Sequence, residues 1–471
     1  MKISIIMCSL NSMPYIMASV ESFKKQKYKN KELIIIYSKS DDHTDEYLKT
    51  IQNNNIKSYN FNGNIYASMN FGIRKSRGDI IGILHSDDIF FSKNVLSNIA
   101  TSFKKENADL VYGNIIYSKK NDLTIYKRSW SNISLLNNYD LPPHTGVFIK
   151  KKILDKMKYN TTYSISSDTD LLLRIFKKNY KTYYTKNYIC NMRMGGLSTN
   201  IFFIIKKAIE DIKIYRKNNL SLLDYFKKIL SKSGQFFFKK NIPVSNYTKK
   251  LNNQCKVKFL NINKFSKING KIISALNLAF ISYNYKYKIR SHKYLFWSDG
   301  VFSSLTTNKK KIPGREIFKK FLKKINNSKE KKKIVILGNL PKLSYQWLKS
   351  QLKKGFNHYP LPYDNVKKIY YKIKKKKFDR KTLVILTLPT PKQEILANLI
   401  SKDNPDTNIL CIGGSINMLS GYEKKAPYIL YRSNLEWLWR LKFDTKRRIL
   451  RLSESLRLMV KMYFFGQNRI F

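Results

Sequence analysis

Short apolar runs alternate with helix-length amphipathic segments through the first 200 residues. Such runs, bounded by polar turns, are typical of buried strands. The clearest are Ile3–Met7, Glu32–Tyr37, Ile80–Leu84 and Leu110–Tyr112. Segments of helix length, such as Met13–Lys24, lie between them. The alternation predicts an α/β domain with a mostly parallel sheet.

A second alternation of strand and helix patterns begins after a helical segment and a polar segment. Residues 201–240 interleave apolar pairs with lysine pairs, and residues 241–256 are polar and contain Pro243. Strand patterns return at Ile334–Gly338, Leu383–Thr387 and Ile409–Gly413. We therefore predict two α/β domains with a helical, basic linker and a C-terminal tail. Their bounds are 1–215, 216–256, 257–445 and 446–471.

The tail carries one apolar helical stripe among basic residues. The stripe consists of Ile449, Leu452, Leu456, Met459 and Tyr463, at spacings of three and four. A basic amphipathic helix of this kind can lie on a membrane surface. It can equally dock on its own domain or on a partner subunit, and the pattern leaves both interpretations open.

Charge and cysteine usage narrow the class of protein. The formal net charge is +59, which favours phosphates, nucleic acid or anionic lipid as partners. The abundance of Lys, Asn, Ile and Tyr together also fits an AT-rich coding bias. Because the lysines are dispersed and no nucleic-acid-binding module is recognisable, we expect no nucleic acid partner. Four scattered cysteines predict neither a disulfide framework nor a zinc site.

The N-terminal apolar run is too short for a signal peptide, and no run of about 18 apolar residues occurs. We therefore expect a cytoplasmic protein, peripheral on the inner face of the cytoplasmic membrane.

Paired carboxylates mark the end of one predicted strand. Asp87 and Asp88 directly follow Ile80–Leu84, and ligands of open α/β sheets bind at the carboxyl ends of strands. Two adjacent carboxylates can hold a divalent cation that neutralises a diphosphate. The same pair could instead cap a helix, so the pair by itself does not decide between these roles.

Further segments, in order and spacing, carry a family resemblance. They are Ser38–Thr44, Pro143-His144-Thr145, Ser166–Asp170 leading into LLLRIF, and Gly195–Ser198. Together with the paired carboxylates they make residues 1 to about 200 resemble glycosyltransferase family 2, which has the GT-A fold.

The resemblance implies an inverting transfer from a nucleotide-diphospho-sugar. It makes Asp88, with Asp87, the ligands of Mg²⁺ or Mn²⁺ on the diphosphate, and Asp168 the general base. It also places Asp42 and Asp79 near the nucleotide. The sequence departs from the family pattern at three positions: Tyr37, Ala67 and His85.

A denser motif cluster lies in the second half. It comprises Thr387–Glu394, the diglycine Gly413-Gly414, Lys425-Ala426-Pro427 and Asn434–Leu441. A diglycine after a strand allows close backbone approach to a ligand, and helix N-termini favour phosphate. The combination resembles glycosyltransferase family 26, the N-acetylmannosaminyltransferase group of surface-polysaccharide pathways.

This second resemblance implies a metal-independent inverting transfer, with no cofactor, from UDP-linked N-acetylhexosamines or their uronic acids to lipid-linked acceptors. Asp299 is then the candidate general base. The donor site would comprise Lys311, Gln393, Glu394, Gly413 and Gly414. Lys311 and Lys425 stand where the family has Arg, which loses the bidentate fork.

Some of these residues also have ordinary structural explanations. Gln393 and Glu394 could cap the helix that they open, and Glu436 could pair with Arg440 four residues later.

The leading hypothesis is a bifunctional enzyme that adds sugars to a polyprenyl-diphosphate-linked glycan of bacterial surface-polysaccharide biosynthesis. The donors would be nucleotide-diphospho-sugars, UDP-sugars foremost. In the alternative, one domain is active and the other is a binding or scaffolding module.

Overall fold

The computed structural model divides the chain into two compact units, Met1–Lys256 and Val257–Phe471. We describe each unit by itself. The structure describes all residues except 132–140, 196–200, 222, 228, 230–241, 301–302, 305–306, 308, 329–331, 425, 433–435, 442–444 and 466–471.

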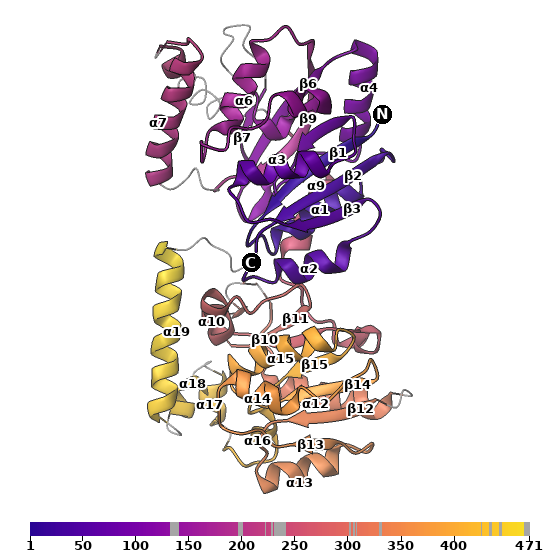
Figure 1. The fold of residues 1–471 in the computed structure, drawn as a ribbon. Coiled ribbons are helices and arrows are strands. Elements are labelled where there is room, and N and C mark those ends of the chain that lie inside the picture. The colour runs from indigo at the N-terminus through magenta and orange to yellow at the C-terminus, as the bar shows by residue number, and fades with distance from the viewer. Residues whose placement is uncertain are drawn as a thin grey trace. The chain divides into compact units, whose positions relative to one another are not determined.

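The N-terminal unit is built on a nine-stranded mixed sheet of order β3-β2-β1-β4-β8-β6-β9-β5, with β7 paired to β6 (Figure 1). The strands are β1 (Ile3–Ser9), β2 (Lys31–Tyr37), β3 (Ile56–Asn60), β4 (Ile80–Ile83), β5 (Ile89–Phe90), β6 (Leu110–Lys119), β7 (Asp122–Trp130), β8 (Val147–Lys150) and β9 (Thr182–Arg193). The helices are α1 (Tyr15–Lys24), α2 (Thr44–Ile51), α3 (Ile65–Lys75), α4 (Val95–Glu106), α5 (Lys151–Lys156), α6 (Ser167–Phe176), α7 (Ile201–Lys217) and α9 (Asn246–Cys255).

The strands of this sheet do not all run in one direction. β1 to β4 pair in parallel, as the apolar alternation predicts. β8 runs antiparallel to both β4 and β6. β7 runs antiparallel to β6, and β5 runs antiparallel to β9. β6 and β9 pair in parallel with each other. The prediction of a mostly parallel sheet is therefore wrong only for β5, β7 and β8, because a buried apolar run reports burial and not direction.

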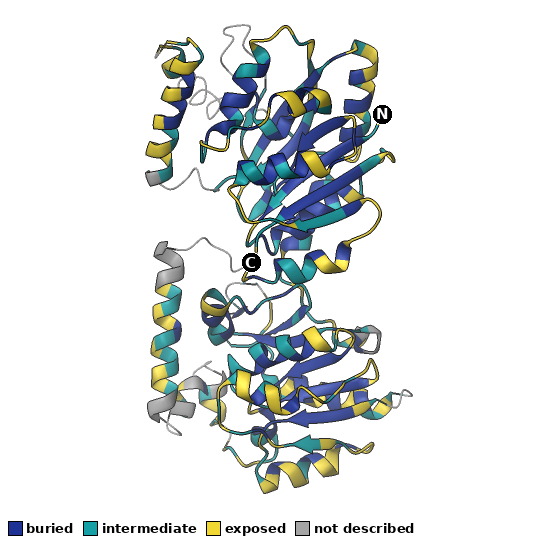
Figure 2. Ribbon diagram, viewed as in Figure 1, coloured by how far each residue is buried: buried dark blue, intermediate teal, exposed yellow. Residues whose placement is uncertain are grey.

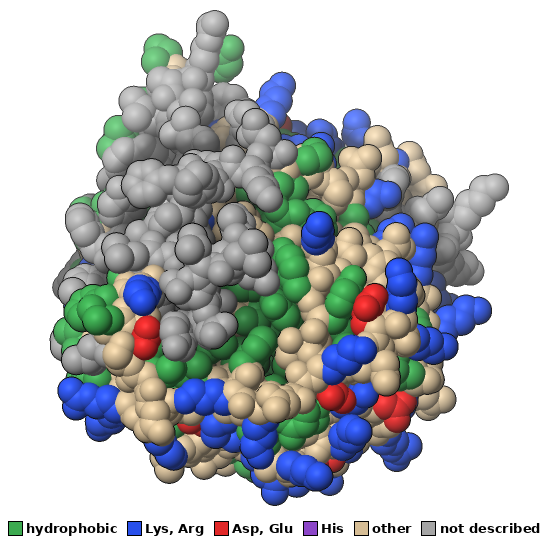
Figure 3. All heavy atoms as spheres, turned by 90° about the horizontal axis from the view of Figure 1, so that it is seen from above, with side chains coloured by type: hydrophobic (Ala, Val, Ile, Leu, Met, Phe, Trp, Pro, Cys, Tyr) green, Lys and Arg blue, Asp and Glu red, His purple; other side chains and the backbone are tan. Residues whose placement is uncertain are grey.

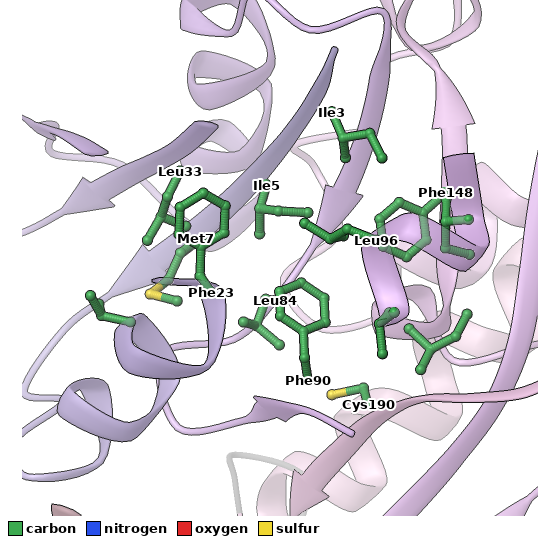
Figure 4. Packing of buried hydrophobic residues seen from close by; sticks show 14 of the residues in the cluster. Ile3, Ile5, Met7, Phe23, Leu33, Leu84, Phe90, Leu96, Phe148 and Cys190 are labelled. Atoms are coloured by element: carbon green, nitrogen blue, oxygen red, sulfur yellow. The ribbon is translucent and has the colours of Figure 1, made fainter. Parts of the chain in front are cut away.

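Alternate residues of the central strands enter two cores on opposite faces of the sheet. Ile3, Ile5 and Met7 pack with helices α1, α2 and α4, whereas Ile6 packs with α3, α5 and α6. Figure 4 shows the first of these cores, with Phe23 and Leu96 reaching the strands from two helices. Continuous burial along the strands, drawn dark blue in Figure 2, explains why Ile3–Met7 of β1 is mostly apolar.

The helix α9 belongs to the N-terminal unit. Its Leu251 and Cys255 pack against Tyr15 and Ala18 of α1 and Leu123 of β7. The Asn252 side chain also accepts from the Leu123 amide at 3.0 Å. The last residues of the segment predicted as a linker are thus part of the first domain.

The C-terminal unit holds a six-stranded, wholly parallel sheet of order β11-β10-β15-β14-β12-β13. The strands are β10 (Ile272–Leu276), β11 (Tyr294–Ser298), β12 (Lys333–Leu337), β13 (Asn357–Tyr359), β14 (Thr382–Leu386) and β15 (Asn408–Cys411). The helices are α10 (Leu278–Tyr287), α12 (Gly314–Asn327), α13 (Lys342–Gln351), α14 (Val366–Ile373), α15 (Lys392–Asp403), α16 (Ser415–Leu419), α17 (Tyr428–Arg432), α18 (Glu436–Leu441) and α19 (Thr445–Phe465).

The tail helix α19 docks on its own unit. Leu458 and Met459 pack against the core beneath α10, and Tyr283 donates a hydrogen bond to Glu454 at 2.6 Å. Ile449 and Leu456 of the predicted stripe remain about half exposed. Among the described residues, no helix combines the length and the apolar character that crossing a bilayer requires.

Gly338 closes β12 at a point where only glycine fits. Its φ is +132°, and a Cβ there would lie 2.1 Å from Thr387 Oγ1. We expect Gly338→Ala to lower the free energy of unfolding by about 2 kcal/mol or more, through overlap and backbone strain together. Urea denaturation measures the change.

Gly355→Ala is the matched control. Gly355 also has a positive φ, +68°, but its Cβ would meet nothing within 4 Å. It should lose only about 1 kcal/mol, from backbone strain. An equal loss in the two variants would contradict the steric explanation.

Candidate active sites

The carboxylates that follow β4 lie in a buried turn. The Asp88 side chain is 1% exposed, and its Oδ1 accepts from the Arg193 amide at 2.8 Å. Its Oδ2 is buried without a hydrogen-bond partner among the described residues. Burial, with the charge of Asp87, raises the pKa of Asp88 well above its usual range. An orphaned buried carboxylate oxygen fits a site completed by a cation.

Arg193, at the end of β9, holds this turn in place. Its Nε donates to the Asp87 carbonyl and its Nη1 to the Lys120 carbonyl, both at 2.8 Å. Its guanidinium lies 4.4 Å from the ring centre of Tyr15. The role of Arg193 could not be predicted from the sequence, because its partners are more than 70 residues away along the chain.

Asp168 lies in the first turn of α6 with both carboxylate oxygens engaged. Oδ2 is 3.0 Å from His144 Nδ1, and Oδ1 accepts from the Tyr66 hydroxyl at 3.2 Å. Burial raises the pKa of Asp168, but the hydrogen bond with His144 and the charges of His144 and Lys207 outweigh it. The pKa is therefore held well below its usual range. The carboxylate is ionised at neutral pH and about a quarter exposed.

Two histidines connect Asp168 to the paired carboxylates. The rings of His85 and His144 meet edge to face, with centroids 4.9 Å apart. Burial and the neighbouring His144 lower the pKa of His85 to about 3, so His85 is neutral. The Asp88 amide donates to the His85 carbonyl at 3.1 Å, so the turn that carries the metal candidates also carries the histidine next to the partner of Asp168.

Asp42 lies beyond the carboxyl end of β2, whereas Asp79 lies at the amino end of β4. Asp42 is buried, and its carboxylate accepts from the amides of Met13 and Thr44, so it ties the loop after β1 to the start of α2. Asp79 precedes β4 and accepts from the Lys2 amide at 2.7 Å. It is exposed at the amino end of the strand, on the opposite edge of the sheet from Asp88. The structure does not bring Asp79 into the site.

In the C-terminal unit, Gln393 and Glu394 join the start of α15 to the strand ends. Gln393 Oε1 accepts from the Gly413 amide at 3.0 Å. Glu394 is fully buried, and its Oε1 accepts from Ser274, Thr390 and Gln393. Burial raises the pKa of Glu394. Gln393 thus holds the turn at Gly413-Gly414, and Glu394 holds the Gln393 side chain.

Asp299 directly follows β11, and its amide donates to the Leu276 carbonyl at 3.1 Å. The Ile312 amide donates to the Ser298 carbonyl at 2.9 Å, which holds the partly exposed Lys311 beside this strand end. β10 separates β11 from β15 in the parallel sheet. Asp299, Lys311 and Gly413-Gly414 therefore share the carboxyl edge.

Glu436 pairs with Arg315 of α12 at 2.6 Å, an ion pair that the sequence analysis did not foresee. The side chain of Arg440, the partner considered there, lies outside the described residues, as do Lys425 and Gly196–Ser198.

Comparison with known families finds a match for each half of the chain. Residues 4–188 match the model of glycosyl transferase family 2, and residues 301–469 match that of the glycosyl transferase WecG/TagA/CpsF family. Both matching models describe glycosyltransferases, so the chain is a glycosyltransferase whose two halves are similar to different families.

Curated relatives match the N-terminal half. An uncharacterised glycosyltransferase of Rickettsia conorii is 28% identical over 188 residues, covering 37% of this chain and 31% of the relative. The UDP-Glc:alpha-D-GlcNAc-diphosphoundecaprenol beta-1,3-glucosyltransferase WfgD of Escherichia coli is 26% identical over 234 residues, covering 47% of this chain and 90% of the relative. The chain thus spans less than a third of the first relative and most of the second.

Among solved structures, S. aureus TarS 1–349 in complex with UDP is 16% identical at a TM-score of 0.37, covering 41% of this chain and 61% of TarS. The mannosyltransferase PcManGT from Pyrobaculum calidifontis, in complex with GDP-Man and Mn²⁺, is 13% identical at the same TM-score, covering 54% of this chain and 68% of that one.

Proposed function

We propose that the chain is a bifunctional inverting glycosyltransferase. Each domain would transfer a sugar from a nucleotide-diphospho-sugar, UDP-sugars foremost, to a polyprenyl-diphosphate-linked glycan of bacterial surface polysaccharide. The lipid-linked acceptor named for the Escherichia coli relative supports this acceptor class. The observation that carries the proposal is that Asp168 contacts His144, whose ring contacts His85 in the turn that holds the buried Asp88.

In the N-terminal domain, the acceptor hydroxyl attacks the anomeric carbon while its proton passes to the Asp168 carboxylate. The bond from that carbon to the diphosphate breaks, and the nucleoside diphosphate leaves with the electron pair. A base is needed because an alcohol is a weak nucleophile at neutral pH. His144 and Tyr66 orient the carboxylate, while neutral His85 adds no charge beside the leaving group.

Asp87 and Asp88 would hold Mg²⁺ or Mn²⁺, with the diphosphate supplying further oxygens. Among the described residues, no group of three or more His, Cys, Asp and Glu side chains gathers as a metal site. Two carboxylates agree with a cation held jointly by protein and substrate phosphates. When bound, the cation offsets the charge that develops on the leaving diphosphate.

In the C-terminal domain, Asp299 would act as the base, and Lys311 with the amides around Gly413-Gly414 would hold the diphosphate. The proposal requires no metal here. The exposed residues Ile449, Leu456 and Val460 of α19, beside its arginines, support a peripheral position on the inner face of the membrane.

A donor panel tests the assignment and yields a prediction for the metal. UDP-, GDP- and TDP-sugars are assayed with detergent-solubilised polyprenyl-diphospho-sugars, with and without EDTA. We expect Asp88→Ala and EDTA each to lower one transfer activity by at least ~100-fold, the order that charge stabilisation in a site provides, and to spare a second. Excess Mn²⁺ or Mg²⁺ should restore the wild type but not Asp88→Ala. A single, EDTA-resistant activity would instead favour the hypothesis that one domain is a binding or scaffolding module.

A further inference from the structure

The helix α7 begins beyond residue 188, where the family 2 match ends. Its Glu210 is 9% exposed, and both carboxylate oxygens contact the same short loop. Oε1 accepts from the Ser164 amide at 2.9 Å and from the Ser164 hydroxyl at 2.8 Å. Oε2 accepts from the amides of Ile165 and Ser166, both at 2.9 Å. One side chain thereby satisfies three consecutive backbone donors.

These amides directly precede α6, the helix that carries Asp168 in its first turn. Amides at a helix start have no partner within the helix, and a carboxylate that accepts from them makes charge-assisted hydrogen bonds. Burial raises the pKa of Glu210, but the hydrogen bonds from Ser164, Ile165 and Ser166 outweigh it and hold the pKa below its usual range. Glu210 is therefore ionised at neutral pH and is held to the loop by these hydrogen bonds.

The opposite side of the same loop touches the base itself. The Tyr66 hydroxyl contacts both the Ile165 carbonyl and Asp168 Oδ1. Ile165 is thus fixed at its amide by Glu210 and at its carbonyl by Tyr66. A shift of the loop would disturb the hydrogen bond that orients the Asp168 carboxylate.

Lys207, nearly one turn before Glu210, stabilises the ionised form of Asp168. Its Nζ donates to Ser166 Oγ at 3.2 Å and lies 3.6 Å from Asp211 Oδ1. Burial lowers the pKa of Lys207, but the charges of Asp168 and Asp211 outweigh it and raise the pKa. A permanent positive charge on α7 therefore faces the site where the acceptor proton arrives.

We propose that Glu210 is a positioning residue for the N-terminal transfer, which holds the 164–166 loop so that Asp168 is aligned with the acceptor hydroxyl. The proposal rests on the proposed function, since it requires Asp168 to be the base. It extends the catalytic unit past the family 2 match to include α7.

Glu210→Gln tests the role in the full-length protein. The amide has the same shape, but its nitrogen cannot accept from Ile165 and Ser166, which leaves buried donors unpaired. We expect kcat to fall about tenfold or more, the cost of a small misplacement of a reacting group, with the donor KM within about twofold. Glu210→Asp, which keeps the charge, should retain more activity than Glu210→Gln. Lys213→Gln, at an exposed position of the same helix, should match the wild type.

A double-mutant cycle separates positioning from general destabilisation. If Glu210 acts through Asp168, adding Glu210→Gln to Asp168→Asn should leave the residual rate of Asp168→Asn unchanged, because the aligned group is already gone. A tenfold further loss in the double variant, or a wild-type kcat in Glu210→Gln, would overturn the positioning role. Full transfer by Asp168→Asn would refute the base assignment of the proposed function instead. Thermal melting of each variant verifies that it is folded.

Discussion

Asp168→Asn is expected to lower the EDTA-sensitive transfer by about 10²- to 10⁴-fold, the range that a positioned general base contributes. Asparagine keeps the shape and can still contact His144 and Tyr66, but it cannot take the acceptor proton. Affinity for the nucleotide should change little, because the loss falls on the chemical step. Initial rates, with calorimetric binding of UDP and Mn²⁺, measure the two quantities.

The control is Asp155→Asn, the same chemical change at an exposed position of α5. It should match the wild type in rate and melting temperature. Unchanged transfer by Asp168→Asn would remove Asp168 from the mechanism.

The lowered pKa of Asp168 makes the stability of the folded protein depend on pH. Its folded pKa lies below the unfolded value of about 3.9. The stability it contributes is therefore present above pH ~4 and is lost as pH falls through the folded pKa. Asp168 remains ionised from pH 5 to 8. If the transfer rate falls as the pH is lowered within that window, the cause is the titration of another group.

Asp299→Asn is expected to remove the EDTA-resistant transfer, again by about 10²-fold or more, and to leave the EDTA-sensitive one intact. Asp299 lies at the carboxyl edge of the parallel sheet beside Lys311, where ligands of such sheets bind. Asp406→Asn, at an exposed turn before β15, is the matched control. Loss of both activities in Asp299→Asn would contradict two independent sites.

The parallel strands were the most predictable part of the fold. β1, β2, β12 and β14 are buried on both faces, so their apolar runs stand out from the polar turns. Buried and more exposed residues are interspersed along β7, so it has no continuous apolar run. The sequence pattern therefore did not predict this strand.

The positions of candidate residues were predictable where a strand ends at a motif, as at Asp88 and Asp299. Arg193, Tyr66 and Glu210 were not, because each acts through contacts 40 or more residues away along the chain. Asp79 shows that closeness in sequence does not ensure closeness in the fold. It lies close to Asp88 in sequence, but the whole of β4 separates them and places them at opposite edges of the sheet.

The packing of α9 has a consequence for where the chain can be divided. Cys255, its last residue, lies 3.4 Å from a guanidinium nitrogen of Arg193, the side chain that holds the Asp87-Asp88 turn. A cut at residue 215 would separate this helix from the Asp87-Asp88 turn. A cut after Lys256 would keep the two together. The segment that preserves these contacts is therefore residues 1–256, which extends almost 70 residues past the family 2 match.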